Sequence, residues 1–284
     1  MEKAGSINID GFELRYQIEG EGQDALVIGS SIYYPRSFSQ NLRKSLRLHF
    51  VDYRGFAKPP EEGISKIPTF DELIDDIEKV RQHLSLKKCI IMGHSAHSLL
   101  ILEYAKKYPQ PISHVVMIGI SPNLGPEYAA MAERNWEESV CPERKAALAE
   151  NVRKFPDEEL AQLPLAEKFV KWNVRRAPQS WFDFHFDSSS LWKGILPNMP
   201  ILDFFYGVAL RDLDVAKGLE TFHLPVFLAL GRFDYIIAPA SSWDPLRPKF
   251  ERLTVRIFER SAHSPHYEEP AHFDAELLAW LKEQ

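Results

Sequence analysis

The feature that most constrains the fold is an alternation of short apolar runs and helical patterns, interrupted once by a long purely helical stretch. Apolar runs at 25–29, 89–92 and 114–120 are typical of buried parallel strands, and helical patterns lie between them. Strands resume at 226–230 and 253–258. Because parallel strands are joined by helices that cover the sheet, the pattern predicts an α/β fold with a mostly parallel central sheet flanked by helices.

Local signals define further elements. Asp10-Gly11 is a strong hairpin turn signal. Thr69, followed by Glu72, forms a capping box before a helix with one apolar face. Further elements are expected as strands over 6–10, 12–18 and 47–53 and as helices over 36–46, 97–108 and 269–282.

Between 121 and 219 the pattern is helical and broken by prolines, with no convincing strand. A connection of this length exceeds what joining two strands requires, so we expect it to have a function of its own. The predicted organisation is a first core part over 1–121, a helical cap over 122–200 inserted between two core strands, and a second core part over 201–284.

A serine lies where a buried strand gives way to a helix, in the run Gly93-His94-Ser95-Ala96-His97. This is the context of the nucleophile-elbow motif G-x-S-x-G, in which a tight turn lifts the serine hydroxyl above the sheet. His97 stands where the motif has its last glycine. The pattern predicts a nucleophile at Ser95, with a buried Gly-Ser turn as the structural alternative.

Three more motifs, one before the elbow and two after it, together with the elbow resemble the α/β-hydrolase family over nearly the whole chain. Asp52-Tyr53-Arg54-Gly55 is similar to the D-x-R-G turn of that family, and Gly231-Arg232-Phe233-Asp234 to its G-x-x-D turn. The segment from Ser261-Ala262-His263 to Glu268-Glu269-Pro270 resembles its terminal A-G-H-x-P-x-x-E-x-P motif. The resemblance implies a Ser95, Asp234, His263 triad in the chain order of the family.

In such a triad His263 takes the proton of the serine hydroxyl, and Asp234 holds and stabilises the imidazole. The oxyanion needs two amide donors. Ala96 is expected to supply one, and Ser31 the other, with Ile32 as an alternative one residue away. The family usually has His-Gly where this chain has Gly29-Ser30.

Other interpretations of these residues are weaker. Two H-x-x-H pairs, His94/His97 and His263/His266, raise the possibility of zinc, but neither cysteine lies near them and H-E-x-x-H is absent, so no metal is expected. Asp212 and Asp214 precede the strand that the triad acid should follow. The expected substrate-binding residues are His94, Tyr33, Trp136, Trp181 and Tyr235.

The predicted cap carries four of the six tryptophans, at positions 136, 172, 181 and 192. These rings either roof a pocket above the serine or fix short helices to the core. Charged cap residues could hold a charged end of the substrate, although surface helix charges are usually only solvated. They are Arg175, Arg176, Glu127, Glu133, Glu137 and Glu138.

The resemblance therefore predicts a serine hydrolase that cleaves an ester, thioester, lactone or amide of a small apolar substrate without a cofactor. One alternative is a prolyl aminopeptidase, a class in which acidic cap residues receive the free amine of the substrate. Its fuller serine motif, G-G-S-W-G, is missing here. Another alternative is a ligand-sensing receptor of the same fold that turns over negligibly.

A net charge of −6 with no block of like charges argues against nucleic-acid or anionic-membrane partners. The two cysteines, Cys89 and Cys141, are expected to be free thiols in a reducing compartment. The first residues lack an apolar signal core, so a cytoplasmic protein is expected. Either a monomer or a homodimer is expected.

Overall fold

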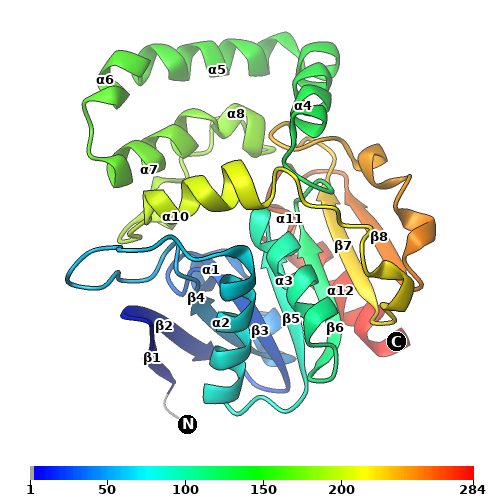
Figure 1. Ribbon diagram of the computed structural model, residues 1–284. Helices are drawn as coiled ribbons and strands as arrows, with labels where there is room; N and C mark the ends of the chain where they lie inside the picture. The colour runs from blue at the N-terminus through cyan, green and yellow to red at the C-terminus, as the bar shows by residue number, and fades with distance from the viewer. Residues whose placement is uncertain (1–2) are drawn as a thin grey trace.

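A computed structural model describes residues 3–284, and its centre is one eight-stranded sheet in the order β1-β2-β4-β3-β5-β6-β7-β8 (Figure 1). β1 and β2 are antiparallel to their neighbours, and the other strands pair in parallel. The expected α/β fold is confirmed. The strands are β1 Ala4–Ile9, β2 Phe12–Glu19, β3 Gln23–Gly29, β4 Leu46–Asp52, β5 Cys89–His94, β6 Ile112–Ile118, β7 Val226–Gly231 and β8 Leu253–Phe258.

The β1–β2 hairpin turns at the expected dipeptide. Asp10 and Gly11 have φ values of 50° and 84°, which gives the turn a twist that matches the flanking strands. The asparagine just before, Asn8, accepts a hydrogen bond from the Gly11 amide through its side chain (3.1 Å).

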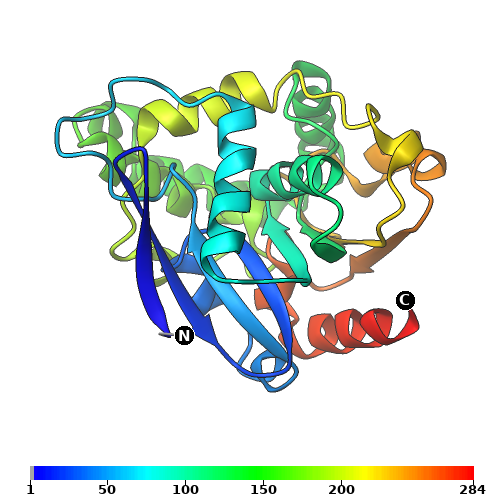
Figure 2. The same ribbon diagram turned by 60° about the horizontal axis from the view of Figure 1, so that its bottom comes forward.

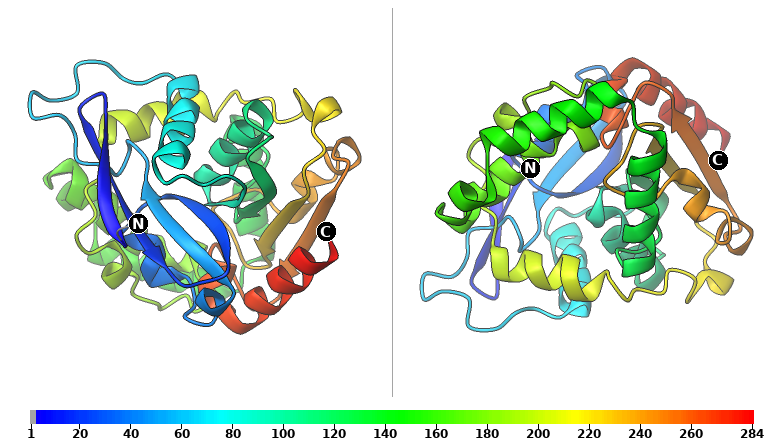
Figure 3. Two further views of the ribbon diagram at one scale, coloured as in Figure 1. Left: turned by 90° about the horizontal axis from the view of Figure 1, so that it is seen from below. Right: turned by 90° about the horizontal axis from the view of Figure 1, so that it is seen from above.

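Helices cover both faces of the sheet. α2 (Phe70–His83) and α3 (Ala96–Lys107) lie on one face and α12 (Pro270–Glu283) on the other (Figure 2; Figure 3, left). The capping box of α2 is present, since Thr69 accepts from the Glu72 amide and Glu72 from the Thr69 amide. The predicted start of α2 is therefore confirmed.

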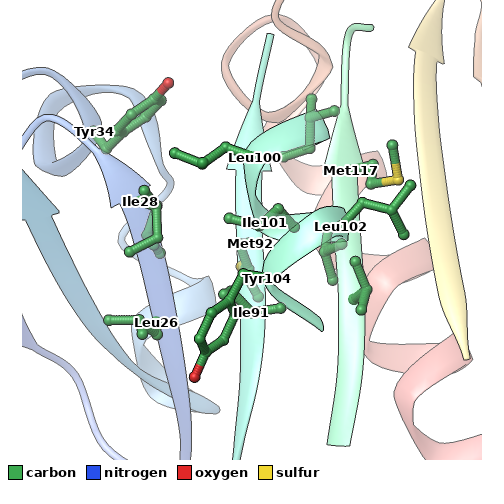
Figure 4. Packing of buried hydrophobic residues seen from close by; sticks show 14 of the residues in the cluster. Leu26, Ile28, Tyr34, Ile91, Met92, Leu100, Ile101, Leu102, Tyr104 and Met117 are labelled. Carbon is green, nitrogen blue, oxygen red and sulfur yellow. The ribbon is translucent and has the colours of Figure 1, made fainter. Parts of the chain in front are cut away.

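The centre of the core lies between α3 and the parallel strands β3, β5 and β6 (Figure 4). Ile91 and Met92 of β5 and Leu100 and Ile101 of α3 are fully buried. Burial of apolar surface stabilises a fold by about 25 cal/mol per Å². The apolar surface buried in this layer therefore fixes α3, and with it the β5–α3 junction, relative to the sheet.

A run of helices lies between β6 and β7 in the chain, above the ends of the parallel strands (Figure 1; Figure 3, right). We call α4–α10 the inserted helices. They are α4 Pro126–Ser139, α5 Pro142–Lys154, α6 Asp157–Ala161, α7 Leu165–Arg175, α8 Ala177–Ser180, α9 Ser189–Trp192 and α10 Met199–Phe204.

The expected helix over 36–46 is wrong. A short helix, α1 (Tyr33–Ser37), ends early and a 3-10 turn covers Leu42–Lys44. The Arg43 guanidinium donates to three main-chain carbonyls of the preceding segment, at Pro35, Phe38 and Ser39. Its Nε also donates to Glu19 (2.6 Å). These long-range and irregular hydrogen bonds take the place of the regular main-chain hydrogen bonds of a continuous helix.

The remaining helix near the carboxyl end is α11 (Pro265–Glu268), which directly precedes α12. No helix within residues 3–284 combines the length and the apolar character that crossing a bilayer requires.

Candidate active site

Ser95 lies at the turn between β5 and α3 in a strained conformation, with φ 57° and ψ −139°. The turn is tight because a Cβ on Gly93 would lie only 2.6 Å from the carbonyl oxygen of His97. The Ser95 amide donates to the Ile118 carbonyl of β6 (2.8 Å). Ser98 strengthens the same junction, since its hydroxyl donates to the Gly93 carbonyl (2.7 Å). This is the geometry of a nucleophile elbow.

His263 and Asp234 come from the turns after β8 and β7 and meet beside this elbow. Nδ1 of His263 lies 2.7 Å from Oδ2 of Asp234, and both side chains are almost completely buried. The second carboxylate oxygen accepts from the Ile236 amide (3.1 Å). Because the carboxylate accepts a hydrogen bond from Nδ1–H, the proton of the neutral ring stays on Nδ1, and Nε2 of His263 is left free to act as a base.

A cavity of about 700 Å³ opens between the strand ends and the inserted helices, and both Ser95 and His263 line it. Three of the expected substrate-binding residues, His94, Tyr33 and Trp181, also line this cavity. The other two do not: Trp136 and Tyr235 pack against each other instead, with ring centroids 5.5 Å apart.

The loop after β3 departs from the expected oxyanion hole. The Ser31 amide donates to Oδ1 of Asp52 (2.7 Å), and the Ile32 amide lies against the Ser30 hydroxyl (3.2 Å). Both amides are therefore already engaged, which disagrees with the expectation for Ser31 and for its alternative. Ala96 is the first residue of α3, as expected.

Asp52 therefore has a role that the sequence motif did not reveal. Its side chain is buried, and burial raises the pKa of its carboxyl, although Arg15 and the Ser31 amide act in the opposite direction. Nε of Arg15 donates to Oδ2 at 2.8 Å. The D-x-R-G motif identifies Asp52, but only the fold brings the Ser31 amide on the loop after β3 within hydrogen-bond distance of it.

His97 fills the space beside the elbow. Its ring centroid lies 4.6 Å from that of Tyr53 and 6.0 Å from that of Phe205. A Cβ on Gly29 would lie 2.4 Å from the ring of Tyr34 and 3.1 Å from Nδ1 of His97, so the glycine at 29 leaves room for both rings. Nδ1 lies 3.2 Å from the His94 carbonyl, and burial lowers the pKa of His97 to about 4, so the ring is neutral at neutral pH.

The two H-x-x-H pairs do meet in space. The ring of His94 lies 4.8 Å from that of His263 and 4.9 Å from that of His266. Nε2 of His94 lies 2.9 Å from the His263 carbonyl, and burial lowers the pKa of His94 and of His266. No group of three or more His, Cys, Asp or Glu side chains in residues 3–284 is arranged to hold a metal.

Glu268 belongs to the terminal motif and has a structural role that the motif does not reveal. Its Oε1 accepts from the amides of Ala262 and Ser264, both at 3.0 Å, which flank His263. Its Oε2 accepts from the Phe182 amide of the inserted helices (2.6 Å). Burial raises the pKa of this carboxyl to about 7. One side chain thus joins the histidine turn to the inserted segment.

The wall opposite the serine comes largely from one face of α7. The residues that line the cavity recur at helical spacing, and none in α7 is fully buried. They are Leu165, Lys168, Phe169, Trp172 and Asn173, followed by Arg176 at the end of the helix. The apolar face of α7 therefore points into the cavity rather than into a packed core.

The arrangement of the sheet, the serine elbow and the Asp234–His263 pair corresponds to one class of proteins, and comparisons with known proteins agree. The chain matches the family described as alpha/beta hydrolase fold over residues 25–270, so it belongs to the α/β-hydrolase family and is a hydrolase. It is 37% identical to the AB hydrolase superfamily protein YclE of Bacillus subtilis, over 99% of each chain.

More distant relatives differ in their descriptions. The chain is 24% identical to the proline iminopeptidase PfmaB of Pestalotiopsis fici over 92% of this chain and 93% of the relative. An α/β fold family hydrolase from Bacillus anthracis matches with a TM-score of 0.68 and 20% identity, over 96% of each chain. This last similarity supports the fold alone.

Proposed function

We propose that this protein is a serine hydrolase that cleaves a small, largely apolar carboxylic ester through an acyl-enzyme on Ser95. The observation that carries the proposal is that an elbow serine and a histidine paired with a carboxylate line one cavity. Ser95 stands in an elbow with φ 57° and lines the cavity together with His263, whose Nδ1 lies 2.7 Å from Oδ2 of Asp234. Thioesters, lactones and amides share the same chemistry and remain related substrate classes.

In the proposed reaction, Nε2 of His263 accepts the hydroxyl proton while Oγ of Ser95 bonds to the substrate carbonyl carbon. Collapse of the tetrahedral intermediate breaks the bond to the alcohol, which leaves with the proton from His263. Water then attacks the acyl group by the same route, which releases the acid and restores the serine. Asp234 keeps Nδ1 protonated and stabilises the imidazolium that forms in each step.

For the oxyanion we propose Ala96 and Ser30 as the amide donors. Ser30 directly follows β3 and lines the cavity. Within the described part of the chain its amide donates no hydrogen bond, so it is free to donate to the oxyanion. The hydroxyl of the same residue faces the amides of Ile32 and Tyr33, both at 3.2 Å, which holds the turn in place. Preorganised amides of this kind each contribute about 100- to 1000-fold in rate.

The inserted helices are proposed to act as a cap that shapes the substrate pocket. Aromatic side chains connect them to the core loop: the Trp192 ring lies 4.7 Å from that of Tyr33 and 5.5 Å from that of Phe169. All three rings line the cavity. Such an apolar wall favours an acyl or aryl group over a peptide backbone.

Labelling with a fluorophosphonate tests the nucleophile. We expect the wild type to be labelled and Ser95→Ala not to be labelled, because only an activated serine reacts with this reagent. Ser188→Ala is the matched control: Ser188 also lines the cavity, and its buried hydroxyl makes no hydrogen bond within residues 3–284. An unlabelled wild type, or labelling that persists in Ser95→Ala, would overturn the proposal.

The relative described as a proline iminopeptidase supports a second candidate, cleavage of an amino-terminal proline. Hydrolysis of L-proline 4-nitroanilide, compared with 4-nitrophenyl butyrate, distinguishes the two. Glu137, one of the acids considered for an amine site, instead pairs with Lys145 (2.8 Å), and none of the four acidic residues considered lines the cavity. A rise in thermal stability on ligand binding without turnover would instead favour a receptor.

A further inference from the structure

A cationic side chain lies in the cavity wall without a carboxylate partner. Arg176 ends α7 and is half-buried, and its Nε donates to Oε1 of Gln179 (2.8 Å). Its guanidinium carbon lies 4.4 Å from the ring centroid of Trp172. No carboxylate in residues 3–284 lies within ion-pair distance of it, and its two terminal nitrogens have no hydrogen-bond acceptor there.

Leaving an arginine partly desolvated and unpaired is unfavourable. Burial lowers the pKa of Arg176 to about 10, although the nearby Asp234 opposes this shift. Charged groups withdrawn from water are normally paired or hydrogen-bonded. Its neighbour Arg175 follows that rule, since it pairs with Asp157 at 2.6 Å on the side of α7 away from the cavity. The contrast points to a missing anionic partner inside the cavity.

Main-chain bonds fix the position of Arg176 relative to the triad. Arg176 directly precedes α8, and the carbonyl of Ser180 in α8 accepts from the His263 amide (3.0 Å). The carbonyl of Gln179 accepts from the Tyr235 amide (3.0 Å), next to Asp234. The helix turn that carries Arg176 is thus attached to both loops that supply the triad.

Within residues 3–284 the cavity wall carries two cationic side chains, Lys168 and Arg176, and only Arg176 is partly withdrawn from water. Lys168 lies two helical turns before Arg176 on the same face of α7. Asp203 is the one carboxylate of residues 3–284 that lines the cavity, and it is exposed, as Lys168 is. A cationic amine is therefore disfavoured near Arg176, whereas a carboxylate would gain a charge-assisted and planar pair.

We propose that Arg176 binds a carboxylate carried by the substrate, so that the preferred substrates are esters with a free carboxylate on the acyl or the alcohol side. This inference rests on the proposed ester hydrolysis at Ser95. Gln179 holds the guanidinium through Nε, and the face of Trp172 supports it, which leaves both terminal nitrogens for a two-point contact with the anion.

The test uses ester pairs in which a free carboxylate is replaced by its neutral methyl ester. Mono-4-nitrophenyl adipate and its methyl ester place the difference on the acyl side, and 4-acetoxybenzoate and its methyl ester place it on the alcohol side. We expect the wild type to have a higher kcat/KM for the anionic member of at least one pair. Arg176→Gln should reduce that kcat/KM by about 10- to 100-fold while leaving the neutral member within about threefold.

Two further variants make the result specific. Arg176→Lys keeps the charge but not the planar fork, so it should retain part of the preference. Arg175→Gln removes the same side chain one position away, on the far side of α7, and should leave the preference unchanged. Equal preference in the wild type and Arg176→Gln would overturn the inference while ester hydrolysis still stood.

Binding to Ser95→Ala, measured by titration calorimetry, tests the inference without turnover. The anionic ester should bind more tightly than the neutral ester, and adding Arg176→Gln should remove the difference. Equal binding of both esters, or no binding of the anionic ester, would overturn the role of Arg176. Failure of labelling and hydrolysis with binding preserved would instead count only against the proposed reaction.

Discussion

At the scale of single residues, His97 shows how the chain tolerates a bulky side chain beside its nucleophile. The ring is 3% exposed and packs against Tyr53 and Phe205, while Gly29 opposite leaves room for it. We predict that His97→Ala lowers the free energy of unfolding by about 2–4 kcal/mol, because the removed ring leaves a cavity. Urea unfolding followed by tryptophan fluorescence measures this loss.

His223→Ala is the control for that prediction, since the His223 side chain is 70% exposed and should cost under about 0.5 kcal/mol. Fluorophosphonate labelling of Ser95 should survive in His97→Ala, because Gly93 and Ile118 hold the elbow independently. A stability change as small as that of the control would contradict the packing role, and a large loss of labelling would indicate a contact with substrate.

The same scale shows what the sequence could and could not predict about the site. Ser95, Asp234 and His263 are marked by local turn motifs, so their positions could be inferred from neighbouring residues. The hydrogen bond of the Ser31 amide could not be inferred in this way, because its acceptor, Asp52, lies on another loop. That Arg176 has no carboxylate partner within residues 3–284 is likewise visible only when the cavity wall is assembled from distant segments.

At the scale of elements, Glu268 joins α11 to the inserted segment through three amide hydrogen bonds. Burial raises the pKa of its carboxyl from 4.5 to about 7, so the folded protein retains this proton at pH values where the unfolded chain has lost it. The stability that this proton contributes is fully present below about pH 4.5 and is lost as the pH rises through about 7.

We therefore predict that the wild type loses stability relative to Glu268→Gln between pH 5 and pH 8, by up to about 1.4 kcal/mol per pH unit. Glutamine cannot titrate, so the difference between the two unfolding free energies isolates this group. Glu259→Gln serves as the control, because Glu259 is 62% exposed and Arg232 lowers its pKa. Parallel pH curves for the wild type and Glu268→Gln would refute the assignment.

Elements whose signals are local were predicted well, and those that depend on distant contacts were not. The hairpin at Asp10-Gly11 and the capping box at Thr69 are set by a few adjacent residues, and both were confirmed. The segment over 36–46 has helical spacing, but Arg43 binds Glu19 and the carbonyls of its own loop instead. Tertiary bonds of this kind override a local helix pattern.

At the scale of the whole molecule, the core and the inserted helices differ in how firmly they are packed. Nine residues of α3 are buried between the sheet and its neighbours, whereas no residue of α7 is fully buried. Leu165, at the start of α7, is 62% exposed, but the other end adjoins α8, which is bonded to the His263 turn. An opening motion of α7 would therefore start at Leu165 and pivot near Arg176.

Hydrogen–deuterium exchange measures this difference directly. We predict that α7 amides exchange at least about 100-fold faster than those of α3 at neutral pH, since α7 needs only a local opening whereas α3 requires disruption of the core. A fluorophosphonate with an apolar tail, once bonded to Ser95, should slow exchange in α7 by contacting its cavity face. Ser95→Ala treated with the same reagent should show no change. Equal protection of the two helices, or an adduct without effect on α7, would mean that α7 is a fixed wall rather than the moving part of the cap.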